Sequence, residues 1–215
     1  QQVEKNGWKK NMEVNMEIKL FGQYDYNVET KDQSLSKYIS LKQVELPHSF
    51  ARHANKFMAK KYVNIVERLA NKLMRGGTGE KLSGKVIRTH GKLQGKKARV
   101  LSIMREAFAA IAKKTKQNTM QLLVRAVENT APREDVTRVR FGGTSYQVAV
   151  DISPQRRLDL ALRNIALAAI ISSFNKKPTL AEALATEIEL AGQNSQDSYA
   201  IKRKNETERM AKAAR

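Results

Sequence analysis

The stretch VTRVRFGGTSYQVAVDISPQRR, residues 136–157, indicates most directly which fold the sequence adopts. Side-chain types alternate over residues 136–141 and again over 144–152, the period of two that places every second side chain on one face of a strand. Gly142 and Gly143 lie between the two runs, and glycine readily takes the positive φ that both positions of a tight hairpin turn require. We therefore expect one β-hairpin formed by these two runs.

The residues after the hairpin predict the start of a helix. Ser153 is a good N-cap, and Pro154 suits the first helical position. From there to about Phe174 the sequence is apolar nearly all round, as is normal for a central, buried helix. Arg156 and Arg157 stand in the first turn, where the helix dipole attracts anions. They either hold a phosphate drawn to the free amide groups or face solvent beside a capped helix, and the sequence favours neither interpretation.

Helical spacing of apolar residues dominates the rest of the sequence after residue 50. Tyr62, Ile65 and Leu69 belong to the apolar face of the first such segment, and Thr179 with Glu182 forms a capping box that opens a later one. Helices are expected at about 60–75, 95–115, 118–131, 179–192 and 198–213. The last of these has almost no apolar stripe, so we expect it to need a partner that holds it.

The remaining segments have less regular patterns. Residues 18–21 and 24–28 are compatible with short strands around Gly22, and residues 27–40 are polar and loop-like. Residues 78–93 are rich in Gly and Lys without a period, which also indicates a loop. We therefore predict a mainly α protein: a bundle of about six helices with one protruding β-hairpin and an N-terminal extension.

The charge of the chain is large and unevenly distributed. It has 40 Lys and Arg residues against 21 Asp and Glu residues, a formal net charge of +19. Residues 1–50 carry seven of each sign, so the whole excess belongs to residues 51–215. Unpaired cations are rarely buried, and so basic a surface repels itself unless a polyanion neutralises it. We divide the chain into a neutral, partly irregular extension (1–50) and a basic helical RNA-binding domain (51–215) with its hairpin at 136–152.

Several functional classes find little support in the sequence. The chain has no cysteine, which excludes disulfide frameworks and cysteine-ligated zinc. The longest apolar run, residues 165–171, is far too short to span a membrane, and no signal peptide is visible. His48, His53 and His90 show no metal-ligand spacing, and residues 76–81 lack the Gly-Lys-Ser/Thr ending of a phosphate loop. We expect no enzyme activity, no catalytic, cofactor or metal site, and no membrane partner.

Two basic stretches are the strongest candidates for RNA contacts. Residues 81–105 contain eight basic side chains and no acidic one, which favours a phosphate-contacting surface over a solvated loop. Arg138 and Arg140 share one face of the hairpin, and a two-stranded ribbon is narrow enough to enter a groove between RNA elements. A plain hairpin with its arginines in water is the alternative, although a lone hairpin is only marginally stable. RNA contacts are predicted at Arg52, Lys56, Lys60, Lys61, Arg75, Lys85, Arg88, Lys92, Lys96, Lys97, Arg99, Lys113, Lys114, Arg133, Arg156, Arg157, Lys202, Arg203, Lys204 and Arg209.

Six ordered segments resemble a known family. They are RHANK at 52–56, VNIVERL at 63–69, ENTAPRE at 128–134, GGTSYQVAVD at 142–151, SPQRRL at 153–158 and ERMAK at 208–212. From about residue 35 to its end the chain is similar to small-subunit ribosomal protein seven of bacteria, called protein five in eukaryotes, and it resembles the archaeal and eukaryotic type. Residues 1–34 carry no such match.

The resemblance implies a helical bundle with one protruding hairpin and a structural role in the small ribosomal subunit of the cytoplasm. It also implies binding to the 3′ major domain of the ribosomal RNA, nucleation of head assembly, and contacts with neighbouring head proteins. The hairpin would lie near the exit-site tRNA and the path by which mRNA leaves. The residues that match the family hairpin are Arg138, Arg140, Phe141, Gly142, Gly143 and Tyr146, and Arg156 and Arg157 match its basic helix start.

Two alternatives belong to other functional classes. The helical content also permits a free regulator that binds mRNA or DNA as a helix-turn-helix protein, and such a regulator would sediment apart from small subunits. A nucleic-acid enzyme such as a nuclease would need clustered carboxylates that hold magnesium, and we can nominate none. Metal-dependent RNA cleavage by purified, nuclease-free protein would support that second alternative.

Overall fold

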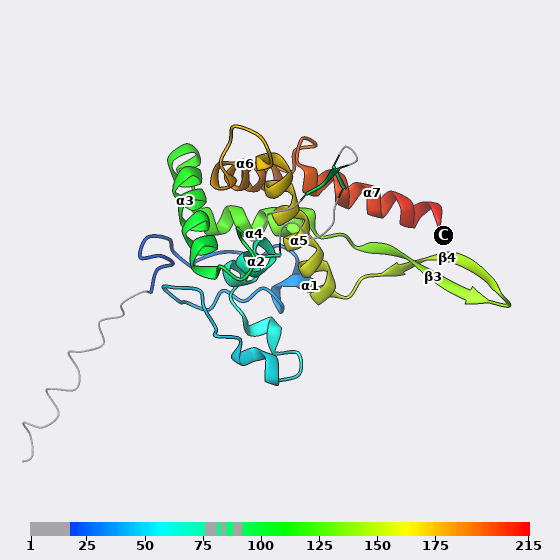
Figure 1. Ribbon diagram of the computed structural model, residues 1–215. Helices are drawn as coiled ribbons and strands as arrows, with labels where there is room; N and C mark the ends of the chain where they lie inside the picture. Colours follow the sequence, from blue (N-terminus) through cyan, green and yellow to red (C-terminus); the bar gives the residue numbers. More distant parts are fainter. Residues whose placement is uncertain (1–17, 76–80, 83–84, 88–91) are drawn as a thin grey trace, which may run out of the picture.

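A computed structural model describes residues 18–75, 81–82, 85–87 and 92–215 (Figure 1). For residues 81–82 and 85–86 it describes the backbone alone. The helices are α1 (Gln33–Ser36), α2 (Ile65–Leu73), α3 (Lys97–Thr115), α4 (Thr119–Thr130), α5 (Pro154–Ser173), α6 (Leu180–Gly192) and α7 (Tyr199–Ala213). The strands are β1 (Lys81–Leu82), β2 (Lys85–Val86), β3 (Glu134–Phe141) and β4 (Thr144–Asp151). This mainly helical architecture with one long hairpin confirms the predicted fold class.

Helix α5 occupies the centre of the bundle. It packs against α2, α4, α6 and α7, and its side chains Leu158, Leu162 and Ile165 are completely buried. Because its apolar residues surround most of its circumference, the helix needs neighbours on several sides, and the bundle supplies them. The predicted central helix is confirmed.

Polar caps define where the neighbouring helices begin. The side chain of Asn118 accepts a hydrogen bond from the amide of Met120 at the start of α4. At the start of α6, Thr179 and Glu182 bond reciprocally to each other's backbone amides, which confirms the predicted capping box. Helix α6 then packs against α3, α4 and α5. No helix in the described ranges combines the length and the apolar character that crossing a membrane requires.

Residues 18–50 lie on the helical body. Leu20, Tyr26 and Leu35 are buried in the same hydrophobic cluster as the helices. Phe21 and Tyr24 place their rings edge-on to Phe108 of α3, with ring centroids 6.2 and 5.7 Å away. This segment, which carries no net charge, thus packs an apolar face against the helices.

Two expectations for residues 18–50 are wrong in detail. The proposed strands at 18–21 and 24–28 reduce to a single antiparallel bridge between Leu20 and Tyr24, which flanks a turn with positive φ at Phe21 and Gly22. The segment 27–40 is not entirely loop, since it contains the short helix α1. The side chain of Asp32 caps α1 by accepting from the amide of Ser34.

The helix expected from residue 60 begins five residues later, at Ile65. The side chain of Asn64 accepts from the amide of Val66, so Asn64 is the N-cap and the chain before it is extended. Residues Ala59–Tyr62 form a 3-10 turn instead. Tyr62 is therefore not part of the buried stripe, and 68% of its surface is exposed.

The loop expected at residues 78–93 contains regular structure. Within its described part, β1 and β2 pair antiparallel, and Ile87 and Leu93 are buried. The burial of Ile87 and Leu93 depends on tertiary packing, which a search for periodicity does not detect. Residues 76–80, 83–84 and 88–91 lie outside the described residues.

Strands β3 and β4 pair antiparallel from Glu134 opposite Asp151 to Phe141 opposite Thr144. Gly142 and Gly143 have φ values of 57° and 83°, as the predicted turn requires. The hairpin extends away from the body, and α7 runs beside its base (Figure 1). A helix with little apolar surface needs partners to hold it. Helix α7 finds them in β3, α5 and α6, which it contacts.

Candidate nucleic-acid interface

Most of the cations predicted to contact RNA lie at the surface. Lys60, Lys61, Lys97 and Lys204 are partly covered, whereas Arg157 is buried. The side chain of Lys85 and the whole of Arg88 lie outside the described residues. The exposed members of the predicted set are Arg52, Lys56, Arg75, Lys92, Lys96, Arg99, Lys113, Lys114, Arg133, Arg138, Arg140, Arg156, Lys202, Arg203 and Arg209.

Residues 48–62, which we call the basic–aromatic loop, leave the body between the N-terminal segment and α2 (Figure 1). The loop is anchored at both ends. The backbone amide and hydroxyl of Ser49 donate to Oε1 of Glu67 over 2.9 and 2.8 Å. Toward the other end, Ala59 is buried and Lys60 donates to Asp159 over 2.5 Å. These contacts fix the loop on α2 and α5.

Glu67 ties this loop to the start of α3. Its carboxylate is buried and lies 2.5 Å from Nζ of Lys97, while Nδ1 of His48 is 4.0 Å away. Burial by itself raises the pKa of Glu67, but the hydrogen bonds from Lys97 and Ser49 outweigh it and hold the pKa below its ordinary value. Lys97, a predicted RNA contact, therefore has its charge neutralised within the protein.

Asp159 of α5 is surrounded by three cations. Its carboxylate lies 2.5 Å from Lys60, 3.2 Å from Arg68 and 3.6 Å from Lys72. Burial tends to raise the pKa of Asp159, but the hydrogen bond from Lys60 and the charges of Lys72 and Arg68 hold it below its ordinary value. One carboxylate for three cations leaves a local positive excess, which suits a surface that meets phosphate groups.

The excess of positive charge around Asp159 also affects the pKa of Lys72. Burial lowers the pKa of its ammonium group, the nearby Asp159 raises it, and the charges of Lys60 and Arg75 lower it again. The outcome is a pKa below the ordinary value. An added anion near Lys60 and Lys72 would relieve this repulsion.

Arg156 and Arg157 point to different environments. Arg156 is exposed and lies 3.4 Å from Asp135 of β3. Arg157 is buried and donates to the carbonyl of Pro132 over 3.1 Å, to Oγ of Ser34 over 2.5 Å and to Asp32 over 2.9 Å. Both sequence interpretations placed this guanidinium at the surface, and the structure corrects them. Its donors are taken up by groups of the protein itself.

Asp32, the ionic partner of Arg157, belongs to the N-terminal segment. Burial tends to raise its pKa, but hydrogen bonds from Ser34 and Arg157 outweigh that effect and hold the pKa below its ordinary value. The residues just before α1, those just after α4 and the start of α5 thus meet around one largely buried ion pair.

The hairpin has two unlike faces. Residues paired across an antiparallel ladder lie on the same face, so the pairs Arg138–Gln147 and Arg140–Ser145 make one face cationic and polar. The other face is formed by the pairs Val139–Tyr146, Phe141–Thr144, Thr137–Val148 and Asp135–Val150. Phe141 and Tyr146 on that face have 80% and 55% of their surfaces exposed. A ribbon that displays both kinds of side chain can contact phosphates on one side and bases or apolar groups on the other.

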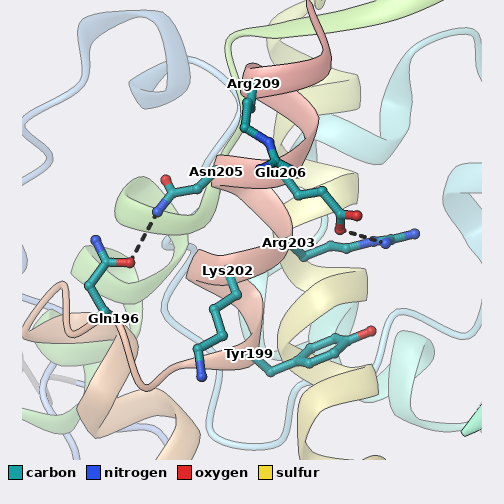
Figure 2. Close-up of a pocket in the computed structure, with 7 residues that line it drawn as sticks. All are labelled: Gln196, Tyr199, Lys202, Arg203, Asn205, Glu206 and Arg209. Atoms are coloured by element: carbon teal, nitrogen blue, oxygen red, sulfur yellow. Dashed lines mark hydrogen bonds and ion pairs between the residues drawn. The ribbon is translucent and has the colours of Figure 1, made fainter. Parts of the chain in front are cut away.

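Helix α7 contributes a groove with a volume of about 460 Å³, lined by Gln196, Tyr199, Lys202, Arg203, Asn205, Glu206 and Arg209 (Figure 2). Figure 2 shows Arg203 directed to Glu206, 2.9 Å away, and Asn205 directed to Gln196. Lys202 and Arg209 lie exposed two helical turns apart. Lys204 instead donates to the carbonyl of Asn129 over 3.0 Å.

Some candidate residues escaped the sequence analysis. Phe50 and Phe57 are 70% and 95% exposed in the basic–aromatic loop, and the signal that marks them is the interleaving of aromatic with basic residues over 48–62. The cluster around Asp159 gave no such signal, because its members come from distant parts of the chain. Among the described residues, no group of three or more His, Cys, Asp or Glu residues is arranged to hold a metal ion.

A comparison with known protein families gives a match over most of the chain. The family described as ribosomal protein S7p/S5e matches residues 35–215, which include the helices α2 to α7 and the hairpin. That family consists of structural ribosomal proteins and is not a family of enzymes. The match also begins where the resemblance found in the sequence begins. The chain therefore belongs to the ribosomal protein S7p/S5e family and is a small-subunit ribosomal protein that acts in translation.

Proposed function

We propose that the chain binds the 3′ major domain of small-subunit ribosomal RNA and nucleates assembly of the subunit head. The exposed cations Arg52, Lys56 and Lys96 carry this proposal. Arg52 and Lys56 line the same hollow as Glu67, but the carboxylate of Glu67 is occupied by Lys97, the residue that follows Lys96. Such a surface keeps its charge available for phosphate groups. Residues of this kind position a protein on folded RNA, and the shape of the RNA supplies the fit.

The role that follows is structural. A protein that binds the folded form of an RNA domain more tightly than its unfolded form stabilises the folded form by mass action. The rigid helical bundle keeps the basic–aromatic loop, the start of α3 and the exposed face of α7 in fixed relation, so several RNA segments can be held together. We propose no chemical step and no cofactor for this activity.

The hairpin is proposed to reach the exit-site tRNA and the mRNA exit path. Its support is the projection of β3 and β4 from the body and the position of Arg138 and Arg140 on one face (Figure 1). Both arginines are exposed. Head proteins of the cytoplasmic small subunit are proposed as the neighbours of the remaining surface.

A footprint on ribosomal RNA tests the proposal. The purified chain should protect nucleotides of the 3′ major domain from hydroxyl radicals. Affinity should fall steeply with salt, with a log–log slope of roughly −0.7 to −0.9 for each phosphate contact. The double variant Arg52→Ala, Lys56→Ala should reduce the magnitude of that slope by the contribution of about two phosphate contacts.

The matched control is Lys19→Ala, because Lys19 is paired with Asp25 over 3.1 Å in the neutral segment. It should leave both footprint and slope unchanged. An affinity for the RNA domain that barely changes between low and moderate salt would contradict the proposed electrostatic binding.

A further inference from the structure

We propose that the basic–aromatic loop binds unpaired nucleotides, with its exposed rings stacked on bases and its cations placed on phosphates. This inference rests on the proposed function and deepens it, because it names the form of RNA that this surface takes. In an A-form duplex the bases are stacked on each other and closed to side chains, whereas splayed bases in loops and bulges are open to aromatic rings.

The loop exposes more aromatic surface than packing explains. Phe57 is 95% exposed, Phe50 70% and Tyr62 68%, and Met58 beside them is 47% exposed. Scattered single apolar residues at a surface are ordinary, but a cluster of large ones marks a contact site.

The backbone holds these side chains outward. Phe50, Ala51 and Met58 have φ values of 51°, 57° and 55°, in the left-handed region that residues other than glycine rarely adopt. Such conformations persist where the surrounding structure enforces them. Here Ser49 is bonded to Glu67 and Lys60 to Asp159, so the loop cannot simply fold its rings onto the body.

The cations of the loop stand next to its rings. The guanidinium carbon of Arg52 is 5.9 Å from the ring centroid of Phe50, and Nζ of Lys61 is 4.9 Å from that of Tyr62. Residues 48–62 contain two further lysines and no acidic residue. A flat ring beside a cation matches a nucleotide, which joins a flat base to an anionic phosphate. An apolar protein partner would instead have to strip these cations of water.

A hollow at the foot of the loop offers room for such a nucleotide. Its volume is about 430 Å³, and Arg52, His53, Lys56 and Tyr62 contribute to its lining. Pockets for small organic ligands begin at roughly 300 Å³. The imidazole of His48 covers one side of Phe50, with centroids 4.1 Å apart and planes 21° from parallel. This stacking shows that the ring of Phe50 accepts a flat partner.

Binding of short RNAs to the full chain tests the inference. The probes are a single-stranded RNA of about ten nucleotides with a central 2-aminopurine, within the site sizes of single-strand binders, and a duplex of the same sequence. Phe57→Leu and Tyr62→Leu should each weaken binding of the single strand about tenfold, the size of one lost stack, and reduce the quenching of 2-aminopurine. Affinity for the duplex should change less than twofold.

The matched control is Leu46→Ala, which removes a residue that is 56% exposed just outside the loop. It should bind both probes like the wild type. Because Phe57 and Tyr62 are exposed, loss of folding is not expected, and circular dichroism checks it. Wild-type affinity of both leucine variants for the single strand would overturn the inference.

Cross-linking in assembled small subunits gives an independent outcome. Ultraviolet light should join a nucleotide to Phe57 or Met58, found on the tryptic peptide of residues 57–60. A cross-link from this peptide to a neighbouring protein would overturn the inference. Failure of the proposed function is a different result, namely wild-type chain that does not protect the ribosomal RNA domain.

Discussion

The guanidinium of Arg157 donates to the carboxylate of Asp32 over 2.9 Å, although 125 residues separate them in the sequence. Through this pair the first turn of α5 holds the N-terminal segment against the body. The remaining donors of Arg157 reach Ser34 and the carbonyl of Pro132, so one buried side chain connects three segments of the chain.

Arg157→Met should therefore destabilise the protein. It leaves Asp32 without its ionic partner and the Pro132 carbonyl without its side-chain donor, and loss of one partner of a buried pair costs about 3–5 kcal/mol, less here because Asp32 is a quarter exposed. We expect about 2–3 kcal/mol less free energy of unfolding in urea. Arg156→Met is the matched control, since Arg156 is 65% exposed, and should stay within about 0.5 kcal/mol of the wild type. Equal loss in both variants would contradict the distinction between the two arginines.

Acid should weaken the folded protein through Asp32, Glu67 and Asp159. Their pKa values lie below the ordinary 3.8, 4.5 and 3.8 when the chain is folded. Each contributes stability that is present above the ordinary pKa and is lost as the pH falls through the folded pKa. The denaturation midpoint should therefore be steady above about pH 5 and decline below about pH 4. Glu67→Gln should flatten that decline, whereas Glu206→Gln, in an exposed pair, should not.

Asp159→Asn should expose the repulsion within its cluster. Arg68, almost fully buried, and Lys72 would keep their positive charges without a counter-ion. We expect a loss of about 2–4 kcal/mol in the free energy of unfolding, partly restored by sulfate, which supplies an anion. Thermal unfolding with matched chloride and sulfate concentrations measures this. A variant as stable as the wild type in chloride would show that the cluster does not depend on this carboxylate.

The cationic face of the hairpin can be tested without disturbing the body. Arg138→Ala with Arg140→Ala should leave the helical circular dichroism unchanged, because both side chains are exposed. Subunits that carry this variant should handle mRNA or tRNA at the exit site less accurately, which assays of frame maintenance and initiation fidelity detect. The control is Ser145→Ala with Gln147→Ala, the neutral cross-strand partners on the same face. Unchanged fidelity in the arginine variant would refute the proposed role.

Local signals predicted much of the fold. The Gly142-Gly143 turn and the capping box at Thr179 depend on neighbours in the sequence, and each lies where expected. Tyr62 was placed wrongly because its spacing fits the stripe of α2, whereas the cap at Asn64 cuts the helix short. Helical spacing alone cannot show where a cap intervenes.

The candidate interface was predictable only in outline. Composition indicates that cations face a polyanion, and most of those predicted are exposed. Which cations are kept for internal pairs depends on contacts between distant segments. Lys97 meets Glu67 and Arg157 meets Asp32 only after the chain has folded, and neither partner lies near in the sequence.

The register in which β3 pairs with β4 decides which side chains lie on each face of the hairpin. Inserting or deleting one residue in the turn would shift the ladder by one position, and every side chain of one strand would exchange sides. Arg138 and Arg140 would then stand among Tyr146 and Val148 instead of Gln147 and Ser145. The length of the Gly142-Gly143 turn therefore matters to the proposed recognition as much as any arginine, because it decides which side chains share a face with Arg138 and Arg140.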